Sequence, residues 1–350
     1  MALFDAEDER FGHQLPEPFR NVVHHNDSWR ESLFFIMQKR NEPGDVLILT
    51  LAHFPAHNEM DSLQLGRVGS SPVMARHART TAADPNNWNV GPVSIDIVEP
   101  KKKIHLLARK SDATPVELDI TFTARTAPYQ LRRGTMKAGN EVVWDQTHMF
   151  QSGTYNGTYT HNGKTYEVEN WWGQRDHSWG VRVHNRCPMW MWTPIQLEEG
   201  FLQVWHWEYP NGARVYTDGC FAPVGGGDPI PVIAFEHDLQ WQDAKGNDVS
   251  YGQFGEEVAG LAGVLTFTLE GGRKFVVEGT GRWAQRYSGI ATKAPNVLGG
   301  GLSEMQVTTS DGQRGSAIYE LTGQWHHRYF PIARGEKLPP LGVTPGELHS

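Results

Sequence analysis

Strand signals dominate the pattern of hydrophobic and polar positions along this chain, and the period of an amphipathic helix is hard to find. Several apolar runs are joined by dipeptides that need a positive φ, such as Asn162-Gly163, Asn211-Gly212 and Asp311-Gly312. Short strands with tight turns and no helices between them are typical of antiparallel barrels or sandwiches. The sequence therefore predicts an all-β protein, with strands over residues 29–38, 45–54, 63–68, 93–98, 104–109, 116–125, 141–150, 154–160, 164–169, 190–196, 202–209, 214–221, 232–242, 264–269, 274–279, 305–309 and 316–321.

A boundary is predicted near the middle of the chain, where residues 183–188 (VHNRCP) interrupt two strongly patterned runs. The length of 350 residues also suggests about two domains. We therefore expect one β-domain over residues 1–185 and a second over residues 186–335. Residues 336–350 contain three prolines and form a Pro-rich tail, either disordered or strapped onto the surface.

Composition narrows the possible partners and the compartment. A net charge of -8 argues against nucleic acid and anionic membranes as partners. No apolar run is long enough to span a membrane, and acidic residues occupy the N-terminal positions where a signal peptide is basic. Two cysteines, Cys187 and Cys220, form no disulfide framework, so we expect a reducing, cytoplasmic location. The sequence does not indicate the oligomeric state.

Two segments resemble cofactor-binding or metal-binding motifs, but the sequence around each one does not support such a site. Residues 279–284 match the G-x-G-x-x-A dinucleotide fingerprint, but no helix pattern follows and no βαβ unit surrounds them. His53, His57 and Glu59 have a spacing that could offer three zinc ligands, but Pro55 breaks the strand between them. We therefore expect neither a cofactor nor a metal.

The densest unusual region lies between Trp171 and Trp207, which contains seven of the 13 tryptophans. Period-2 alternation places His177 and Trp179 on one face of a strand and Asp176 on the other. It likewise places His206 and Glu208 on one face of a later strand. If the two strands are neighbours, one surface carries two imidazoles, a carboxylate and an indole together.

Such a surface suits acid catalysis on an alkene. Burial against aromatic rings raises the pKa of a carboxyl group, which makes Glu208, or its competitor Asp176, a proton donor near neutral pH. Aromatic faces stabilise a developing cation, and histidine orients or deprotonates a water. The structural alternative is a tryptophan core with a buried ion pair between Asp176 and neighbouring arginines. The aromatic residues predicted to contact the substrate are Trp172, Trp192, Trp207 and Tyr209.

The segment GQRDHSWG at residues 173–180, followed by the aromatic strand, resembles the carotenoid 1,2-hydratase superfamily, which includes kievitone hydratase and the AttH-like proteins. Residues 315–320 (GSAIYE) resemble the closing strand of these proteins. The resemblance implies two consecutive lipocalin-like antiparallel β-barrel domains. It also implies catalytic roles for His177 and Trp179, and it places His206 and Glu208 where the family has a Tyr-x-Asp pair.

The predicted activity is that of a cofactor-independent hydratase, a carbon–oxygen lyase that adds water to, or removes it from, an apolar isoprenoid, terpenoid or prenylated aromatic. In this interpretation Glu208 is the acid, His177 and His206 position the water, and Trp179 shields the cation. One alternative is a terpenoid or polyketide cyclase or isomerase that uses the same acid, and another is a carrier of a hydrophobic ligand. More distant residues that could join the site are Arg282, Tyr287, Glu320 and His326.

Overall fold

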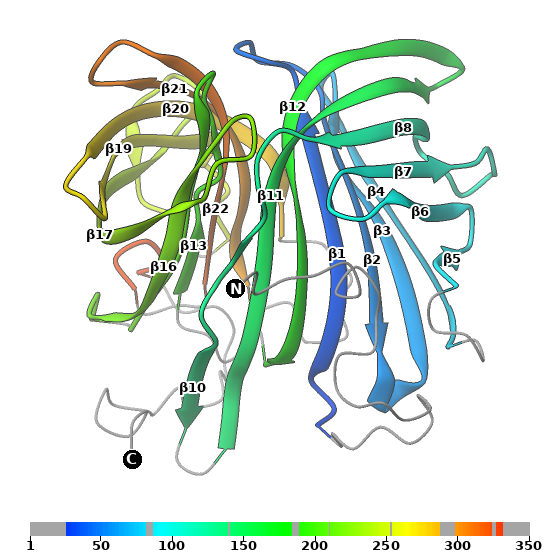
Figure 1. Cartoon of the computed structure of the whole chain (residues 1–350), viewed down its shortest axis with the longest axis horizontal. Coiled ribbons are helices and arrows are strands. Elements are labelled where there is room, and N and C mark those ends of the chain that lie inside the picture. The colour runs from blue at the N-terminus through cyan, green and yellow to red at the C-terminus, as the bar shows by residue number, and fades with distance from the viewer. Residues whose placement is uncertain are drawn as a thin grey trace.

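The computed structural model describes residues 26–81, 87–138, 141–183, 189–209, 211–252, 254–287, 298–323 and 327–331. These residues form two antiparallel β-sheets, and the one short helical segment among them is a 3-10 turn at Pro55–His57. The prediction of two consecutive antiparallel β-barrels is confirmed (Figure 1). The predicted domain boundary, Cys187, His326 and the Pro-rich tail lie outside the described residues. No helix in the described part of the chain is long and apolar enough to cross a membrane.

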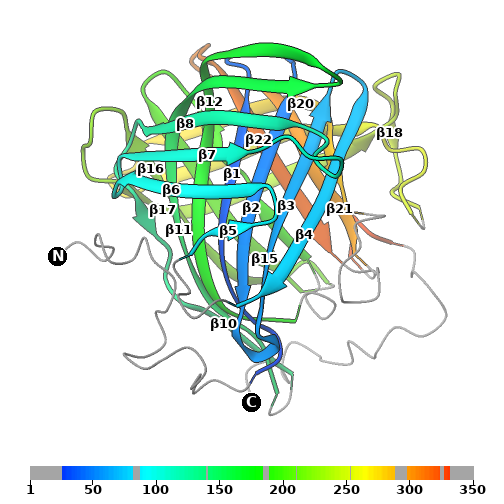
Figure 2. The same ribbon diagram turned by 90° about the vertical axis from the view of Figure 1, so that its right-hand side faces the viewer.

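The first sheet has twelve strands, in the order β4-β3-β2-β1-β12-β11-β8-β7-β6-β5, with β9 and β10 paired to β11 (Figure 2). The strands are β1 (Trp29–Gln38), β2 (Val46–Phe54), β3 (Glu59–Val68), β4 (Ser71–Thr80), β5 (Asn89–Val90), β6 (Val93–Glu99), β7 (Lys103–Ala108), β8 (Glu117–Ala124), β9 (Tyr129–Gln130), β10 (Gly134–Ala138), β11 (Glu141–His161) and β12 (Lys164–Arg182). The long strands β11 and β12 are joined by the predicted turn at Asn162 and Gly163, both of which have positive φ.

A seam remains between the two ends of this sheet. No backbone ladder joins β4 to β5 among the described residues. The side chain of Arg79 on β4 crosses the seam instead, and its Nε donates a hydrogen bond to the carbonyl oxygen of Asn89 at 2.6 Å. Its Nη2 donates to the carbonyl oxygen of Asn87. The first barrel is therefore closed on one side by a side chain rather than by strand pairing.

The second sheet closes into a ring through backbone pairing. Its strands are β13 (Met189–Trp192), β14 (Ile195–Gln196), β15 (Gly200–Glu208), β16 (Arg214–Pro223), β17 (Ile230–Gln242), β18 (Asp248–Val249), β19 (Gly260–Leu269), β20 (Lys274–Arg286), β21 (Gly299–Thr309) and β22 (Arg314–Gly323). The order runs from β13, β15 and β14 through β22, β21, β20, β19 and β17 to β16, and β16 pairs back onto β15. These pairings form a ring, in which the link between β16 and β17 is short and consists of Cys220–Pro231 and Phe221–Ile230.

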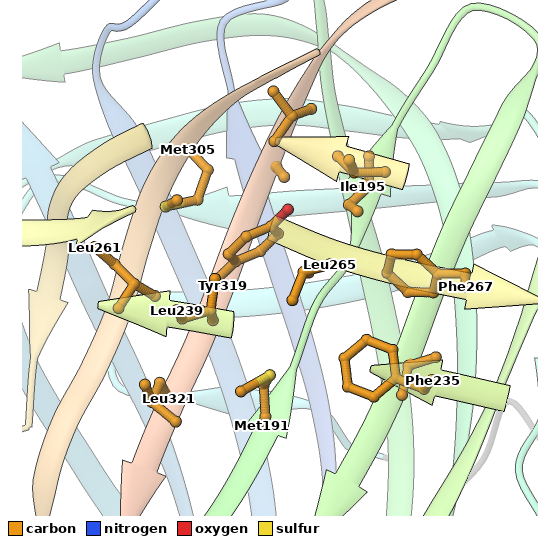
Figure 3. Close-up of a cluster of buried hydrophobic side chains, with 14 of the residues drawn as sticks. Met191, Ile195, Phe235, Leu239, Leu261, Leu265, Phe267, Met305, Tyr319 and Leu321 are labelled. Atoms are coloured by element: carbon orange, nitrogen blue, oxygen red, sulfur yellow. The ribbon is translucent and has the colours of Figure 1, made fainter. Parts of the chain in front are cut away.

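Each barrel encloses its own apolar core. The first core contains Leu33 and Phe35 from β1, which point inward because alternate residues of a strand share a face. The second core contains Leu265 and Phe267 from β19, with Tyr319 and Leu321 from β22 (Figure 3). These cores use one face of each strand and leave the other face to solvent or to the partner barrel.

The outward faces of β1, β2, β11 and β12 pack against the second barrel. One shared cluster joins Ile36 and Ile48 of the first sheet to Leu302 and Ile318 of the second. A second shared cluster is aromatic; its buried aromatic members are Trp144, Phe150, Trp190, Trp192, Phe201, Trp205, Trp207 and Tyr209. Five of the 13 tryptophans therefore lie at the junction of the two barrels.

Candidate active site

Successive side chains of β12 point to opposite faces of the first sheet, so its polar residues point in two directions. His177 lies opposite Leu33 of β1, which belongs to the core of the first barrel. Asp176 lies opposite Phe34, which packs against the junction clusters. His177 therefore faces the interior of the first barrel, and Asp176 faces the junction.

Strand β15 divides its residues in the same way. Val204 belongs to the core of the second barrel, and His206 and Glu208 share its face. Trp205, Trp207 and Tyr209 belong to the aromatic junction cluster. The face assignments made from the sequence thus hold within each strand.

The condition for one shared surface, that the two strands are neighbours, is not met. Strand β12 pairs with β1 and β11 in the first sheet, whereas β15 pairs with β13, β14 and β16 in the second. The five predicted catalytic residues therefore do not share one β surface. They belong to three polar groups, one inside each barrel and one at the junction.

The group inside the first barrel is built on a histidine–carboxylate pair. His177 Nε2 lies 3.0 Å from Glu31 Oε1, and both side chains are almost fully buried. The ring of Trp179 packs edge-on against His177, with the ring centroids 5.3 Å apart. Burial lowers the pKa of nearby His53 to about 4, although the charge of Glu31 opposes this shift. His53 is therefore neutral near pH 7. His57 and Glu59, which shared its zinc-like spacing, contact the Asp27 carbonyl and Arg76 instead.

The junction group is centred on Asp176. Burial raises the pKa of its carboxyl group to about 7, against the opposing charges of Arg182 and Arg30 and with support from the charge of Glu320. Ser178 Oγ donates a long, weak hydrogen bond to Asp176 Oδ1 at 3.5 Å. Asp176 thus gains and loses its proton near pH 7, the pH range in which a general acid or base is most effective.

A second carboxyl group faces Asp176 from the other barrel. Glu320 on β22 accepts a hydrogen bond from the hydroxyl of Tyr287 at 2.7 Å, and burial raises the pKa of both groups. Tyr287 and Glu320 were among the distant residues that the sequence analysis left open. Arg282, from the same set, instead forms an ion pair with Glu304 at 3.2 Å.

Unpaired polar atoms surround Asp176 on the outward face of the first sheet. Among the described residues, no hydrogen-bond partner is found for Nε and Nη2 of Arg182, for Nε of Arg30, or for either amide atom of Gln146. Arg182 is 7% and Gln146 is 4% exposed. Buried donors and acceptors in native proteins almost always have a partner, so these atoms require water or a bound molecule.

Aromatic rings form the wall of this junction. Trp192 lies 5.0 Å from Phe150 and 5.9 Å from Phe34, measured between ring centroids. His148, the register partner of Ser178, stacks on Phe150 and packs against Trp205. Burial and the charge of Arg182 lower the pKa of His148 well below its usual value, so its imidazole is neutral.

The predicted substrate-contacting aromatics lie in different parts of the junction. Trp192, Trp207 and Tyr209 are buried in the aromatic cluster. Trp172 instead lies under two guanidinium groups, those of Arg40 at 4.7 Å and Arg125 at 4.5 Å from its ring. All three residues belong to the first barrel, so Trp172 lies apart from the aromatic cluster.

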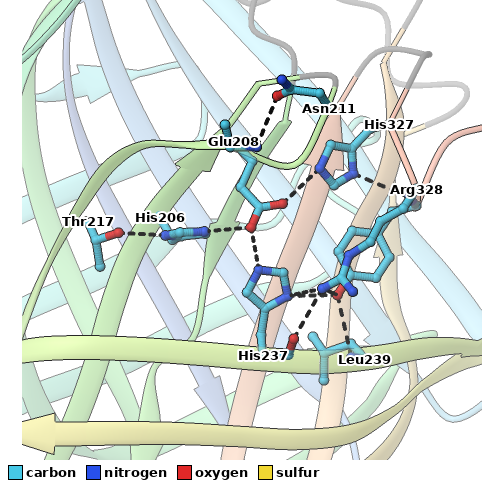
Figure 4. A network of polar contacts seen from close by, with 10 residues as sticks. His206, Glu208, Asn211, Thr217, His237, Leu239, His327 and Arg328 are labelled. Carbon is cyan, nitrogen blue, oxygen red and sulfur yellow. Dashed lines mark hydrogen bonds and ion pairs between the residues drawn. The ribbon is translucent and has the colours of Figure 1, made fainter.

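The group inside the second barrel is a cage of histidines around Glu208 (Figure 4). His206 Nε2 and His237 Nε2 lie 3.0 and 2.7 Å from Glu208 Oε1, and His327 Nε2 lies 2.8 Å from Oε2. Burial opposes ionisation of Glu208, but the hydrogen bonds from these three rings hold its pKa well below the usual range. Glu208 is therefore a carboxylate that accepts hydrogen bonds, and its surroundings disfavour the proton-donor role expected from the sequence.

The comparisons with known proteins agree with this fold. An AttH protein from Nitrosomonas europaea is similar in structure, with a TM-score of 0.57 and 12% identity over 90% of this chain and 98% of that one. CghA, in its crystal structure with Sch210972, has a TM-score of 0.50 and 8% identity over 85% of this chain and 89% of that one. Kievitone hydratase from Nectria haematococca has a TM-score of 0.47 and 12% identity, over 85% and 88% of the two chains.

At these identities the first two structures confirm the resemblance to the hydratase and AttH-like superfamily at the level of the fold. No curated protein matches the chain. The model of a family of unknown function (DUF8625) matches residues 6–302. Because this match covers most of the chain, the protein belongs to that family.

Proposed function

We propose that this protein is an acid–base enzyme of the hydratase or cyclase type, with its active site at the junction of the two barrels and Asp176 as the proton donor. The observation that carries the proposal is a buried carboxyl group with a pKa of about 7, set beside aromatic rings and unpaired polar atoms. The shared fold with CghA and the AttH protein is compatible with this activity.

The reaction follows from these parts. Protonated Asp176 gives its proton to one carbon of an alkene, and the positive charge develops on the other carbon. The rings of Trp192 and Phe150 stabilise this cation through their electron-rich faces. Water then adds to the cation and returns a proton to the Asp176 carboxylate, so that one water is consumed and the enzyme is regenerated.

Polar neighbours would place the water and the substrate. His148 lies on β11, diagonally across from Asp176, and its neutral imidazole is suited to orient a water. The unpaired donors of Arg182 and the amide of Gln146 would hold an oxygen atom of the substrate or the water itself. We propose an apolar isoprenoid, terpenoid or prenylated aromatic as substrate, because the rest of the wall is aromatic.

No cofactor takes part in the proposed step, since a carboxyl group supplies the proton and water supplies the hydroxyl. We further propose that the protein acts in the reducing cytoplasm, which suits its buried free thiol, Cys220.

The test is an assay of a panel of linear and prenylated isoprenoids in H2-18O. We expect one mass-labelled alcohol as product, and we expect D176N to lose at least about a hundredfold in kcat, the usual weight of general acid catalysis. The wild-type rate should fall as the pH rises above about 7, because Asp176 then loses its proton. The control is D96N, which removes an exposed carboxylate on β6.

Three outcomes separate the alternatives. An unlabelled cyclic product that still depends on Asp176 identifies the cyclase within the proposed class. Full activity in folded D176N contradicts the role of Asp176. Binding of the panel without turnover, with D176N binding equally well, identifies a carrier of hydrophobic ligands and overturns the enzymatic proposal.

A further inference from the structure

The cage inside the second barrel has the donor set of a transition-metal site. Two imidazoles and one carboxylate converge there, and their ligand atoms all lie within 4.8 Å of one another. His206, Glu208 and His237 have side chains that are 3%, 9% and 5% exposed. We propose that these three residues bind one divalent metal ion, with Zn²⁺ the best match.

The geometry requires little movement to admit the ion. Ligand atoms of a tetrahedral zinc lie about 2.0–2.1 Å from the metal, so neighbouring ligand atoms are roughly 3.3 Å apart. His206 Nε2 and His237 Nε2 now lie 3.0 and 2.7 Å from the same oxygen, Glu208 Oε1. A small outward shift of each ring would therefore place three ligands around a metal, in the two-histidine, one-glutamate set that leaves a fourth position open.

Second partners are in place to orient the two ligand rings. His206 Nδ1 lies 2.7 Å from Thr217 Oγ1, and His237 Nδ1 lies 2.8 Å from the hydroxyl of Tyr329. Metal-bound histidines usually donate from their second nitrogen to an oxygen of this kind, which leaves Nε2 free for the metal. Phe235 packs against both rings and supplies an apolar surround.

Arg328 is a cation in direct contact with the ligand His237. Its Nη2 lies 2.7 Å from His237 Nδ1, but also 2.9 Å from the Tyr329 hydroxyl and 3.1 Å from the His237 carbonyl oxygen. The two hydrogens of Nη2 can serve the two oxygens, which frees His237 Nδ1 to donate to Tyr329. With a metal on Nε2 and the proton on Nδ1, the guanidinium would move away from Nδ1 and keep its two oxygen acceptors.

His327 has a different role from the two ligand histidines. Its Nδ1 accepts a hydrogen bond from the backbone N–H of Tyr329 at 3.3 Å, so its Nε2 carries the proton and donates to Glu208 Oε2. It therefore holds the carboxylate with Oε1 turned toward the other two rings. We assign it as a positioning residue for the metal ligand Glu208 rather than as a ligand.

The experiment measures metal binding directly on the full chain without an affinity tag. Protein freed of metal with a chelator is titrated with Zn²⁺ against a chromophoric competitor, and with Co²⁺ by visible absorption. We expect a single ion per chain and cobalt d–d bands of a four- or five-coordinate site. H237Q and E208Q should weaken binding by more than about a hundredfold, and H327Q by about tenfold.

The matched control is H105Q, because His105 makes a similar imidazole–carboxylate contact with Asp119 on the protein surface. It should leave the affinity unchanged. Folded wild-type protein that takes up no Zn²⁺ or Co²⁺ overturns the proposal, and so does equal affinity in H237Q and H105Q. D176N should bind the metal as wild type does, so failure of the proposed function and failure of the metal site are distinguishable.

Discussion

At the scale of the residue, the chemistry of each carboxyl group follows from its neighbours. Glu208 and Asp176 are both buried, yet three imidazoles hold the pKa of Glu208 low and burial raises that of Asp176. Spacing along the chain placed both residues among candidate acids and favoured Glu208, whereas the surroundings of the two groups favour Asp176. His237 and His327 were missed because they lie 29 and 119 positions from Glu208, and no local pattern joins such distant residues.

The raised pKa of Asp176 also predicts how stability depends on pH. Its carboxyl group ionises near pH 3.8 when the chain is unfolded and near 7 when it is folded. The folded chain binds more protons between these values, so the free energy of unfolding falls as the pH rises from about 4 to about 7. The whole effect is on the order of 4 kcal/mol and is complete above pH 7.

We therefore expect D176N to be more stable than wild type at pH 8 by a few kcal/mol and to lose this advantage near pH 4, as measured by urea unfolding at both pH values. D96N should change the free energy of unfolding little at either pH. The same difference between D176N and wild type at pH 4 and pH 8 would contradict the raised pKa.

At the scale of the element, tight turns and buried strands were predicted well, and edge strands were not. The span of β1 and the Asn162-Gly163 turn were predicted from the sequence. Strand β4 was missed because its residues are mostly exposed, which removes the apolar alternation, and Pro72 lies near its start. The predicted strand at residues 164–169 covers only the first third of β12, since its later residues are buried on both faces, although the face assignment of His177 and Trp179 treated that part as strand too.

The β11–β12 hairpin offers a test of its own packing. Gly180 has a φ of +135°, and a Cβ added there would lie 2.1 Å from the carbonyl oxygen of Asp145. Gly163, in the turn of the same hairpin, has a φ of +75° and open space around it. We expect G180A to lower the free energy of unfolding by at least about 2 kcal/mol and G163A by about 1 kcal/mol, measured by denaturant unfolding. Equal losses would show that β12 does not approach β11 this closely.

At the scale of the whole molecule, the two barrels share apolar clusters and should unfold together. Ile95 is buried in the core of the first barrel alone. We expect I95A to cost about 2 kcal/mol or more and to lower hydrogen-exchange protection equally in β7 and β20, because the junction couples the barrels. V98A, at an exposed position of the same strand, should change neither. Unchanged protection in β20 of I95A would mean that the barrels unfold independently.

The seam of the first barrel bears on the risk of aggregation through added strands. Unpaired strand edges are templates on which another chain can add a strand and begin to aggregate. The second barrel reduces this hazard because its strands form a ring of pairings, in which the β16–β17 link is short. In the first barrel the guanidinium of Arg79 occupies the carbonyl oxygens of Asn87 and Asn89, which an incoming strand would need. The side chain of Arg79 thus blocks strand addition at the β5 edge of the seam, where backbone pairing is absent among the described residues.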